Sequence, residues 1–320
     1  MMKHIIVLLA CIAALNAYAW NGVGHRAVAK LAWDDLSKKE RAAATALLKQ
    51  HPHYSNILTA DVPAGVDTNE WAFLTAAVWP DLVRPAKAGQ PPKPRSVTKY
   101  NVNPHAIDLP FLGRGETNRG LIRDFKKPDP DLRVVMSDAI RTLQNRKASA
   151  HDRAVSLSLI LHLMADSHQP LHAAAMVTSE RPKGYGGGGS LLVRNLRGEQ
   201  SSYHTYWDSL PGDDMSYSGI VAYANALEAD PALKKRRLPE YRKNRTPAAW
   251  TQESCETGAN FAYAADWFRI VEARDLASGK VQPSEVPQVT PAFHAEAEKV
   301  AQRRLALARY RLTKVLKSTW

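Results

Sequence analysis

The segment LHLMADSHQPLH, residues 161–172, gathers imidazole and carboxylate groups at a spacing that suits a metal site. His162 and Asp166 stand four residues apart, so on a helix they project from one face. Pro170 limits that helix, and His172 follows just after the break. Imidazole and carboxylate are the ligand types expected of catalytic zinc. The apolar residues around His162 indicate a buried helix, where a hydrogen-bonded His–Asp pair without metal is the alternative.

The same spacing recurs downstream, where His204 and Asp208 are also four residues apart. One such pair is a weak signal, but two pairs and a further histidine beyond a proline are difficult to attribute to a solvated surface. Two upstream stretches, VWPDLVR and NPHAIDLPF, add candidates that taken singly are better interpreted as loop contacts: Asp81, Arg84, His105 and Asp108.

The elements that must position these residues are mainly helical. Apolar residues recur at helical spacing in several stretches: His25–Leu36, Lys39–Leu48, Leu132–Leu143, Ala154–Ser167 and Ala292–Leu316. Two proline-rich stretches, 84–96 and 281–291, are typical of surface loops. The glycine-rich stretch 184–199 is the one expected β element, a small hairpin that turns near Arg197-Gly198. Nothing marks a domain boundary, so we expect one mainly α, multi-helix domain over residues 20–320.

The first nineteen residues have the features of a secretory signal peptide. Lys3 supplies a positive charge, an apolar run follows, and Ala17-Tyr18-Ala19 is an A-x-A cleavage site. A lipoprotein cleavage at Cys11 is the alternative, but the apolar run before it is short. No stretch is long enough for a membrane span. We therefore expect a secreted or periplasmic protein that is cleaved after Ala19 and begins at Trp20.

Composition restricts the function classes. The net charge is +12, or +11 once Lys3 leaves with the signal peptide, and this favours polyanionic partners such as nucleic acid. Cys255 is the only cysteine of the expected mature chain, so no internal disulfide can form. The run KKRRLPEYRKNR, residues 234–245, is either a solvated face or a polyanion-binding surface.

Taken together, the motifs resemble those of the zinc-dependent single-strand nucleases, the S-one/P-one nuclease family. The resemblance runs from Trp20 to about Asp208, in five motifs that occur in the family's order. These motifs are Trp20–His25, Trp79–Arg84, His105–Asp108, His162–His172 and His204–Asp208. Bacterial zinc-dependent phospholipase C shares the helical fold and the metal plan, so it is the nearest alternative.

The resemblance implies three zinc ions and a nuclease that cleaves single-stranded DNA and RNA to 5′-phosphorylated products, with 3′-nucleotidase activity as a further expectation. One zinc would take Asp81, His105, His162 and one oxygen of Asp166. Its neighbour would take the terminal amine and carbonyl oxygen of Trp20, with His25 and the other oxygen of Asp166. The third would take His172, His204 and Asp208.

Further roles follow from the same resemblance. Asp81 would also orient the attacking water, and Arg84 would neutralise charge on the phosphoryl group. Asp108 would hydrogen-bond the docked base. The family often places a large aromatic residue after the histidine of its third motif, whereas this chain has Ala106. Tyr185 or Tyr203 is the alternative stacking platform.

The remaining histidines have no place in this scheme. Among them His168 lies inside the long motif, and we expect it on the surface or next to the ligands. We expect a monomer whose partners are nucleic acids and nucleotides, with no stable protein partner. A non-enzymatic polyanion or metal binder is a second alternative, which the complete ligand set disfavours.

Overall fold

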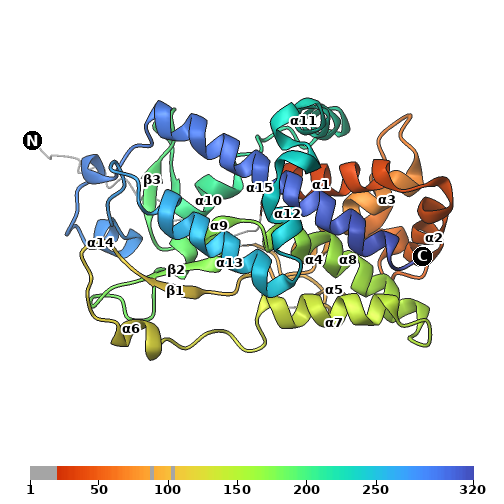
Figure 1. The fold of residues 1–320 in the computed structure, drawn as a ribbon, viewed down its shortest axis with the longest axis horizontal. Helices are drawn as coiled ribbons and strands as arrows, with labels where there is room; N and C mark the ends of the chain where they lie inside the picture. The colour runs from red at the N-terminus through yellow and green to blue at the C-terminus, as the bar shows by residue number, and fades with distance from the viewer. Residues whose placement is uncertain (1–19, 87–89, 102–104) are drawn as a thin grey trace, which may run out of the picture.

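The computed structural model of the protein describes residues 20–86, 90–101 and 105–320, and most of them are helical (Figure 1). The helices of nine residues or more are α1 (Gly22–Asp35), α2 (Lys38–Leu48), α3 (Thr68–Ala76), α7 (Leu132–Gln144), α8 (Ala150–Asp166), α11 (Tyr217–Ala229), α13 (Pro247–Thr257) and α15 (Pro291–Lys317). The expectation of a mainly α fold is confirmed.

Short elements connect these helices. The short α-helices are α4 (Trp79–Leu82), α5 (Arg95–Thr98), α6 (Gly120–Arg123), α9 (Pro170–Ala173), α10 (Tyr203–Asp208), α12 (Pro239–Lys243) and α14 (Ala273–Ala277). Single 3₁₀ or π turns are η1 (Tyr54–Leu58), η2 (Gly186–Gly188), η3 (Pro231–Leu233), η4 (Lys235–Arg237), η5 (Gly258–Ala262) and η6 (Pro283–Glu285).

The helices begin where the sequence offers side-chain caps. Ser37 and Glu40 form a capping box at the start of α2, and Ser149 caps α8. Thr290 caps α15, whose first residue is Pro291. These caps explain why each of the three helices begins slightly before the first apolar residue of its periodic pattern.

Helix α8 is the centre of the fold. From Leu157 to Asp166 every residue is buried, so the helix has no solvent-facing side in its second half. It packs against α1, α2, α3, α4, α7 and α15. The metal-ligand candidates of the long motif therefore lie at the buried end of the most enclosed helix.

The strands form two separate two-stranded sheets. Strands β3 (Leu192–Arg194) and β4 (Gln200–Ser202) pair antiparallel, which confirms the expected hairpin. The expectation of a single β element is wrong, because β1 (Leu109–Leu112) pairs in parallel with β2 (Ala174–Val177). Each of these two strands is four residues long and far from its partner in sequence. The pairing of β1 with β2 depends on how the helices bring His105 and His172 together. No local sequence pattern predicts that contact.

Two arginines of α15 hold the loop that follows α8. Glu253 accepts hydrogen bonds from Arg304 at 2.8 Å and from Arg311 at 2.7 and 2.8 Å. Arg304 Nε also donates to the carbonyl oxygen of His168 at 3.2 Å. The C-terminal helix thereby fixes the turn between Asp166 and the start of α9.

The surface position expected for His168 is wrong. Its side chain is fully buried, with Nδ1 2.7 Å from the carbonyl oxygen of Met164 and Nε2 2.6 Å from Arg311 Nη1. Burial, together with the charges of Arg311 and Arg304, holds the pKa of His168 well below its usual value. The neutral ring therefore donates through Nδ1 and accepts from the arginine through Nε2.

No helix among the described residues is long and apolar enough to cross a membrane. The segment expected to be the signal peptide, residues 1–19, lies outside the described residues.

The buried position of His168 makes it a stability determinant. We expect His168→Ala to lower the free energy of unfolding by about 1–3 kcal/mol, because it removes two buried hydrogen bonds and leaves polar partners without them. Urea denaturation measures the change. The control is His151→Ala, an exposed histidine of α8, with an expected change within about 0.5 kcal/mol. Equal stability of the two variants would contradict the role assigned to the buried ring.

Candidate metal centre

The end of α8 brings two imidazoles against one carboxylate. His105 Nδ1 and His162 Nε2 each lie 3.1 Å from Oδ2 of Asp166. The two ring nitrogens are themselves 2.8 Å apart. All three side chains are buried, and their donor atoms lie close enough together to hold one metal ion.

A second group adjoins the first. His25, near the start of α1, stacks on the ring of His162 with centroids 4.0 Å apart. Its Nε2 lies 3.4 Å from Asp166 Oδ1, the oxygen that does not face His105. Asp81 Oδ1 lies 3.8 Å from both His105 Nδ1 and His162 Nε2. These five side chains form one continuous cluster in which Asp166 offers an oxygen to each side.

A third group lies on α9 and α10. Asp208 faces His172 and His204, with its Oδ1 3.9 Å from His172 Nε2 and its Oδ2 3.6 Å from His204 Nε2. His172 Nδ1 is also 4.0 Å from Asp166 Oδ1, so this group adjoins the cluster at α8. Pro170 begins α9 and turns the chain so that His172 points back toward the end of α8.

Backbone carbonyl oxygens fix the orientation of three of these rings. Each accepts from Nδ1 of an imidazole, in the pairs His162–Ala77, His172–His105 and His204–Gly187. A carbonyl oxygen only accepts, so Nδ1 of each ring carries a proton, and Nε2 is the nitrogen left to bind a metal. Proteins orient metal-ligating histidines in this way.

The turn at Gly187 needs glycine. The residue has φ +57°, and a Cβ there would lie 2.4 Å from the carbonyl oxygen of Leu171 and 3.2 Å from His204 Nδ1. The glycine-rich stretch therefore serves the close approach of the backbone to His204.

Several buried acceptors in the cluster have no hydrogen-bond partner among the described residues. They include Nε2 of His25, Oδ1 of Asp166 and Oδ2 of Asp208. A buried polar group without a partner costs about 1–3 kcal/mol, and a buried charge costs more. Metal ions would satisfy all of these atoms at once, so the donors present fit a metal centre.

Charge in the cluster agrees with this interpretation. Burial raises the pKa of Asp208 well above its usual value, and the carboxylates of Asp166 and Asp81 add to the effect. Burial also lowers the pKa of His105 to about 4. Neutral imidazole is the form that binds metal, and a cation would offset the repulsion among the carboxylates.

Trp20 is anchored beside these groups. Its ring is fully buried, and Nε1 donates to the carbonyl oxygen of Ala165 at 3.1 Å. The next residue, Asn21, donates its N–H to the carbonyl oxygen of Asp208 at 3.0 Å. At Gly24 a Cβ would lie 2.9 Å from Cβ of Trp20, so a larger residue would displace the tryptophan.

Arg84 lies at the more open side of the cluster. Its Nε is 3.0 Å from Asp81 Oδ1 and 3.3 Å from His105 Nε2. The side chains of Arg84 and Asp81 are 21% and 16% exposed, whereas Asp166 is fully buried. Trp79 anchors the short helix α4 by donating a hydrogen bond from its indole N–H to His53 Nδ1 at 2.9 Å. An anionic ligand would therefore approach from the side of Arg84.

Asp108 stands directly before β1 with φ 53°, an uncommon conformation for a residue other than glycine. Burial raises its pKa, and His172 opposes that rise.

Neither Tyr185 nor Tyr203 replaces the aromatic residue missing at Ala106. Their side chains are 1% and 0% exposed, and both hydroxyls are hydrogen-bonded within the protein.

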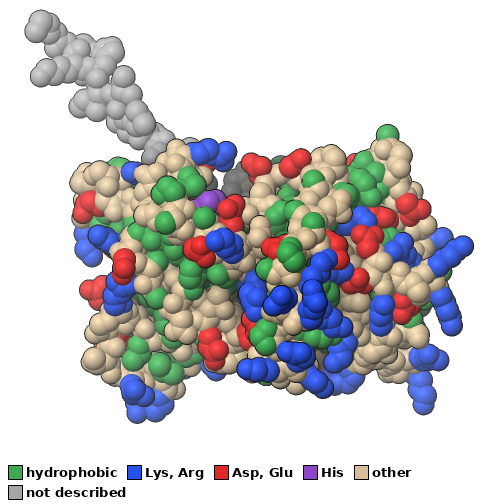
Figure 2. Space-filling view, turned by 45° about the horizontal axis from the view of Figure 1, so that its top comes forward, with side chains coloured by type: hydrophobic (Ala, Val, Ile, Leu, Met, Phe, Trp, Pro, Cys, Tyr) green, Lys and Arg blue, Asp and Glu red, His purple; other side chains and the backbone are tan. Residues whose placement is uncertain are grey.

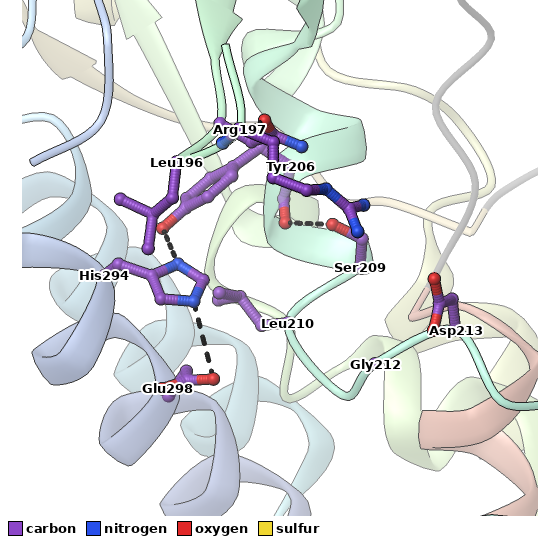
Figure 3. Close-up of a pocket in the computed structure, with 10 residues that line it drawn as sticks. Leu196, Arg197, Tyr206, Ser209, Leu210, Gly212, Asp213, His294 and Glu298 are labelled. Atoms are coloured by element: carbon purple, nitrogen blue, oxygen red, sulfur yellow. Dashed lines mark hydrogen bonds and ion pairs between the residues drawn. The ribbon is translucent and has the colours of Figure 1, made fainter. Parts of the chain in front are cut away.

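The opposite face of α10 packs against α15 (Figure 3). Tyr206, between the two ligand candidates of α10 in the sequence, points toward α15 and places its hydroxyl 3.0 Å from His294 Nδ1. His294 Nε2 lies 3.5 Å from Glu298. This contact uses a histidine for which the sequence offered no role, and it holds α10 so that His204 and Asp208 face inward.

Gln169 is a further residue that contacts the third group, and the sequence analysis assigned it no role. The side chain is fully buried, and its Nε2 donates to Asp208 Oδ1 at 2.8 Å. Its Oε1 accepts from the N–H of Leu171, which caps α9 ahead of His172. One amide thus positions two members of the third group. The signal available in the sequence was the polar amide of Gln169 within a motif of buried residues.

A model of the S1/P1 nuclease family matches residues 20–320, which confirms the resemblance noted in the sequence. The match begins at Trp20, the residue that the signal-peptide pattern places first. No curated protein matches the chain in sequence.

The hydrogen bond of Gln169 generates a prediction about metal affinity. Gln169→Leu keeps the approximate size but loses the donor to Asp208, so zinc should bind the third group about 10–100-fold more weakly. Titration of the protein with a chelator, followed by elemental analysis, measures the loss. The control is Gln252→Leu on the exposed side of α13, which should keep its zinc. Zinc affinity equal to that of the unmodified protein in Gln169→Leu would show that the amide does not position the ligands.

Proposed function

Since the chain belongs to the S1/P1 nuclease family, we propose that it is a zinc-dependent enzyme that hydrolyses single-stranded DNA and RNA. The products carry a 5′-phosphate and a free 3′-hydroxyl, and 3′-nucleotidase activity accompanies the cleavage. The observation that carries the proposal is the buried cluster of imidazole and carboxylate groups, in which acceptors face acceptors.

Three ions would be held by residues between Trp20 and Asp208. One zinc is assigned to Asp81, His105, His162 and Asp166. A second is assigned to Trp20, His25 and Asp166, and a third to His172, His204 and Asp208. Zinc ions held by these residues would lower the pKa of a water molecule to about 7 and would offset negative charge on a phosphodiester.

The chain's own residues bind and orient the substrate. Arg84 gives up part of its ion pair with Asp81 and donates a hydrogen bond to a non-bridging oxygen of the phosphodiester. Negative charge grows on that oxygen in the transition state. Asp81 accepts a hydrogen bond from the attacking water and directs it at phosphorus, in line with the leaving 3′ oxygen.

Asp108 contacts the base beside the scissile phosphate. Because Ala106 offers no ring for stacking, the base is held by hydrogen bonding with less stacking, which is worth about 1–3 kcal/mol per base elsewhere. We therefore propose a broad base preference. Single strands are favoured because their bases are free to turn toward Asp108.

Export belongs to the same proposal. Cleavage after Ala19 frees the amine of Trp20, whose ring is buried beside Ala165 at the end of α8. A free α-amine has a pKa near 7.7–8.0, so enough of it is unprotonated at neutral pH to bind a metal. Processing of the precursor would thus complete the metal centre.

The function is tested with protein that begins at Trp20. We expect about three zinc ions per chain, one for each of the three ligand sets assigned above. Single-stranded DNA should be cut to 5′-phosphorylated fragments much faster than duplex DNA. Absence of cleavage, or headgroup release from phosphatidylcholine instead, would overturn the proposal in favour of the phospholipase C alternative.

A variant for comparison with the protein that begins at Trp20 carries one additional methionine before Trp20. An amide nitrogen then replaces the amine, and its lone pair is delocalised into the carbonyl. We expect zinc to be lost from the site of Trp20 and His25 and retained at His172, His204 and Asp208. Mass spectrometry confirms both N-termini, and equal zinc and activity in the two proteins would exclude the terminal amine as a ligand.

Arg84→Ala separates phosphate binding from metal binding. We expect unchanged zinc content and a kcat lowered by about 10²–10³, the usual loss for one transition-state donor. The control is Arg141→Ala, because Arg141 also pairs with an aspartate three residues before it but lies on the surface of α7. Unchanged turnover in Arg84→Ala would remove Arg84 from the mechanism.

A further inference from the structure

A dense group of cations lies outside the candidate metal centre. Residues 234–245, which span η4 and α12, contain seven lysines and arginines and one acidic residue. Figure 2 shows Lys and Arg side chains gathered near the middle of one face, where α12 lies. The exposed cations, which we call the basic surface, are Lys235, Arg236, Arg237, Arg242, Lys243 and Arg245.

The charge of the basic surface is not neutralised locally. The nearby acidic groups are already paired, Glu240 with Arg303 at 2.8 Å and Glu228 with Lys234 at 2.8 Å. Within the described part of the chain, none of the six exposed cations has a carboxylate within ion-pair distance. Uncompensated like charge repels itself and attracts polyanions, so this surface favours an anionic partner.

An aromatic pocket opens beside the same cations. Its volume is about 130 Å³, and it is lined by Tyr241, which is partly exposed, by the buried Trp250 and by the cationic residues Arg245 and Lys314, so Tyr241 is the ring available for stacking. Lys235 lies over the ring of Tyr241 at 4.7 Å from the centroid. Rings next to cations are the combination that holds single-stranded nucleic acid, because bases stack on the rings while phosphates meet the charges.

The pocket has a rigid base. Arg311 lines it and is 2% exposed, with both terminal nitrogens bound to the carboxylate of Glu253. Because α15 is fixed in this way, the pocket is formed before any ligand binds, which lowers the ordering cost of binding.

The basic surface lies apart from the metal-ligand candidates. Helix α12 packs against α15, and α15 packs against α8, which carries His162 and Asp166. A helix with its side chains is about 10 Å across, so a strand must pass around α15 to reach both places. Only a long strand can occupy both.

We propose that the basic surface and the adjoining pocket form a second binding surface for long single-stranded nucleic acid. This rests on the proposed function, since it gives the same substrate a second point of attachment. The surface raises the affinity for long strands and leaves the cleavage of short ones unaffected.

The test is steady-state cleavage of a 30-nucleotide oligothymidylate and of a trinucleotide by the zinc-loaded protein. The neutralised variant combines Arg236→Gln, Arg237→Gln, Arg242→Gln and Lys243→Gln. We expect its KM for the long strand to rise about tenfold or more, with kcat and the trinucleotide KM unchanged. The salt dependence should also weaken, by a slope of about 0.7 for each phosphate that no longer meets a cation.

A matched control removes the same net charge elsewhere. It combines four exposed cations on or near α14, which lies at the left end of the molecule in Figure 1, away from α12, in the substitutions Lys183→Gln, Arg269→Gln, Arg274→Gln and Lys280→Gln. Its KM values should match those of the unmodified protein. Tyr241→Leu should raise the long-strand KM about fivefold without changing the salt slope, because stacking is not ionic.

Two results would overturn the inference. One is an equal long-strand KM in the neutralised and control variants. The other is that the unmodified and control proteins bind anionic phosphatidylglycerol vesicles, the neutralised variant does not, and its long-strand KM is unchanged. That result would assign the basic surface to membrane binding. If the unmodified protein cuts neither substrate, the proposed function fails instead. Fluorescence anisotropy of the uncut 30-nucleotide strand with the same variants then decides whether the surface binds it.

Discussion

The structure depends on keeping carboxylates and imidazole lone pairs together inside an apolar core. Asp166 is fully buried, and its two oxygens face histidines on opposite sides. Removing a charged group from water costs several kcal/mol even after the protein relaxes. Oδ1 of Asp166 and Oδ2 of Asp208 have no hydrogen-bond partner among the described residues to offset that cost. Cations can offset it, and the expected mature chain has no disulfide with which to stabilise such a core by other means.

The surrounding elements hold these groups against their mutual repulsion. Backbone carbonyl oxygens orient His162 and His204, and the amide of Gln169 holds Asp208. Farther out, Arg304 fixes the turn after α8 from the C-terminal helix. Residues from the first helix to the last therefore contribute to one site.

Charge is distributed unevenly over the molecule in a way that suits an anionic polymer. Negative carboxylates are gathered in the interior, where metal ions would compensate them. Arg84 stands at the more open side of that cluster. The exposed cations of residues 234–245 lie beyond α15, on a separate surface. A polyanion thus finds positive groups both at the site of chemistry and at a distance from it.

The sequence by itself determined the helical class, the histidines and aspartates able to bind metal, and the approximate extent of α1, α2, α7, α8 and α15, whereas α3, α11 and α13 were not predicted. These features are local: apolar periodicity, caps such as Ser149, and the four-residue spacing of His162 and Asp166 are all properties of neighbouring residues. The hairpin around Gly198 was predictable for the same reason.

Only the tertiary structure decided which distant groups meet. The parallel pairing of β1 with β2 joins segments more than sixty residues apart, and neither strand has a pattern of its own. Likewise, histidine is a residue type common on surfaces and in metal sites, yet His168 is buried in the core. There it contacts Arg311, from the far end of the chain. The role of Gln169 was hidden because its partner, Asp208, is brought within 2.8 Å only by the packing of α10. Contacts between distant residues depend on how whole helices pack, and that packing is set by the summed burial of many side chains rather than by any short stretch of sequence.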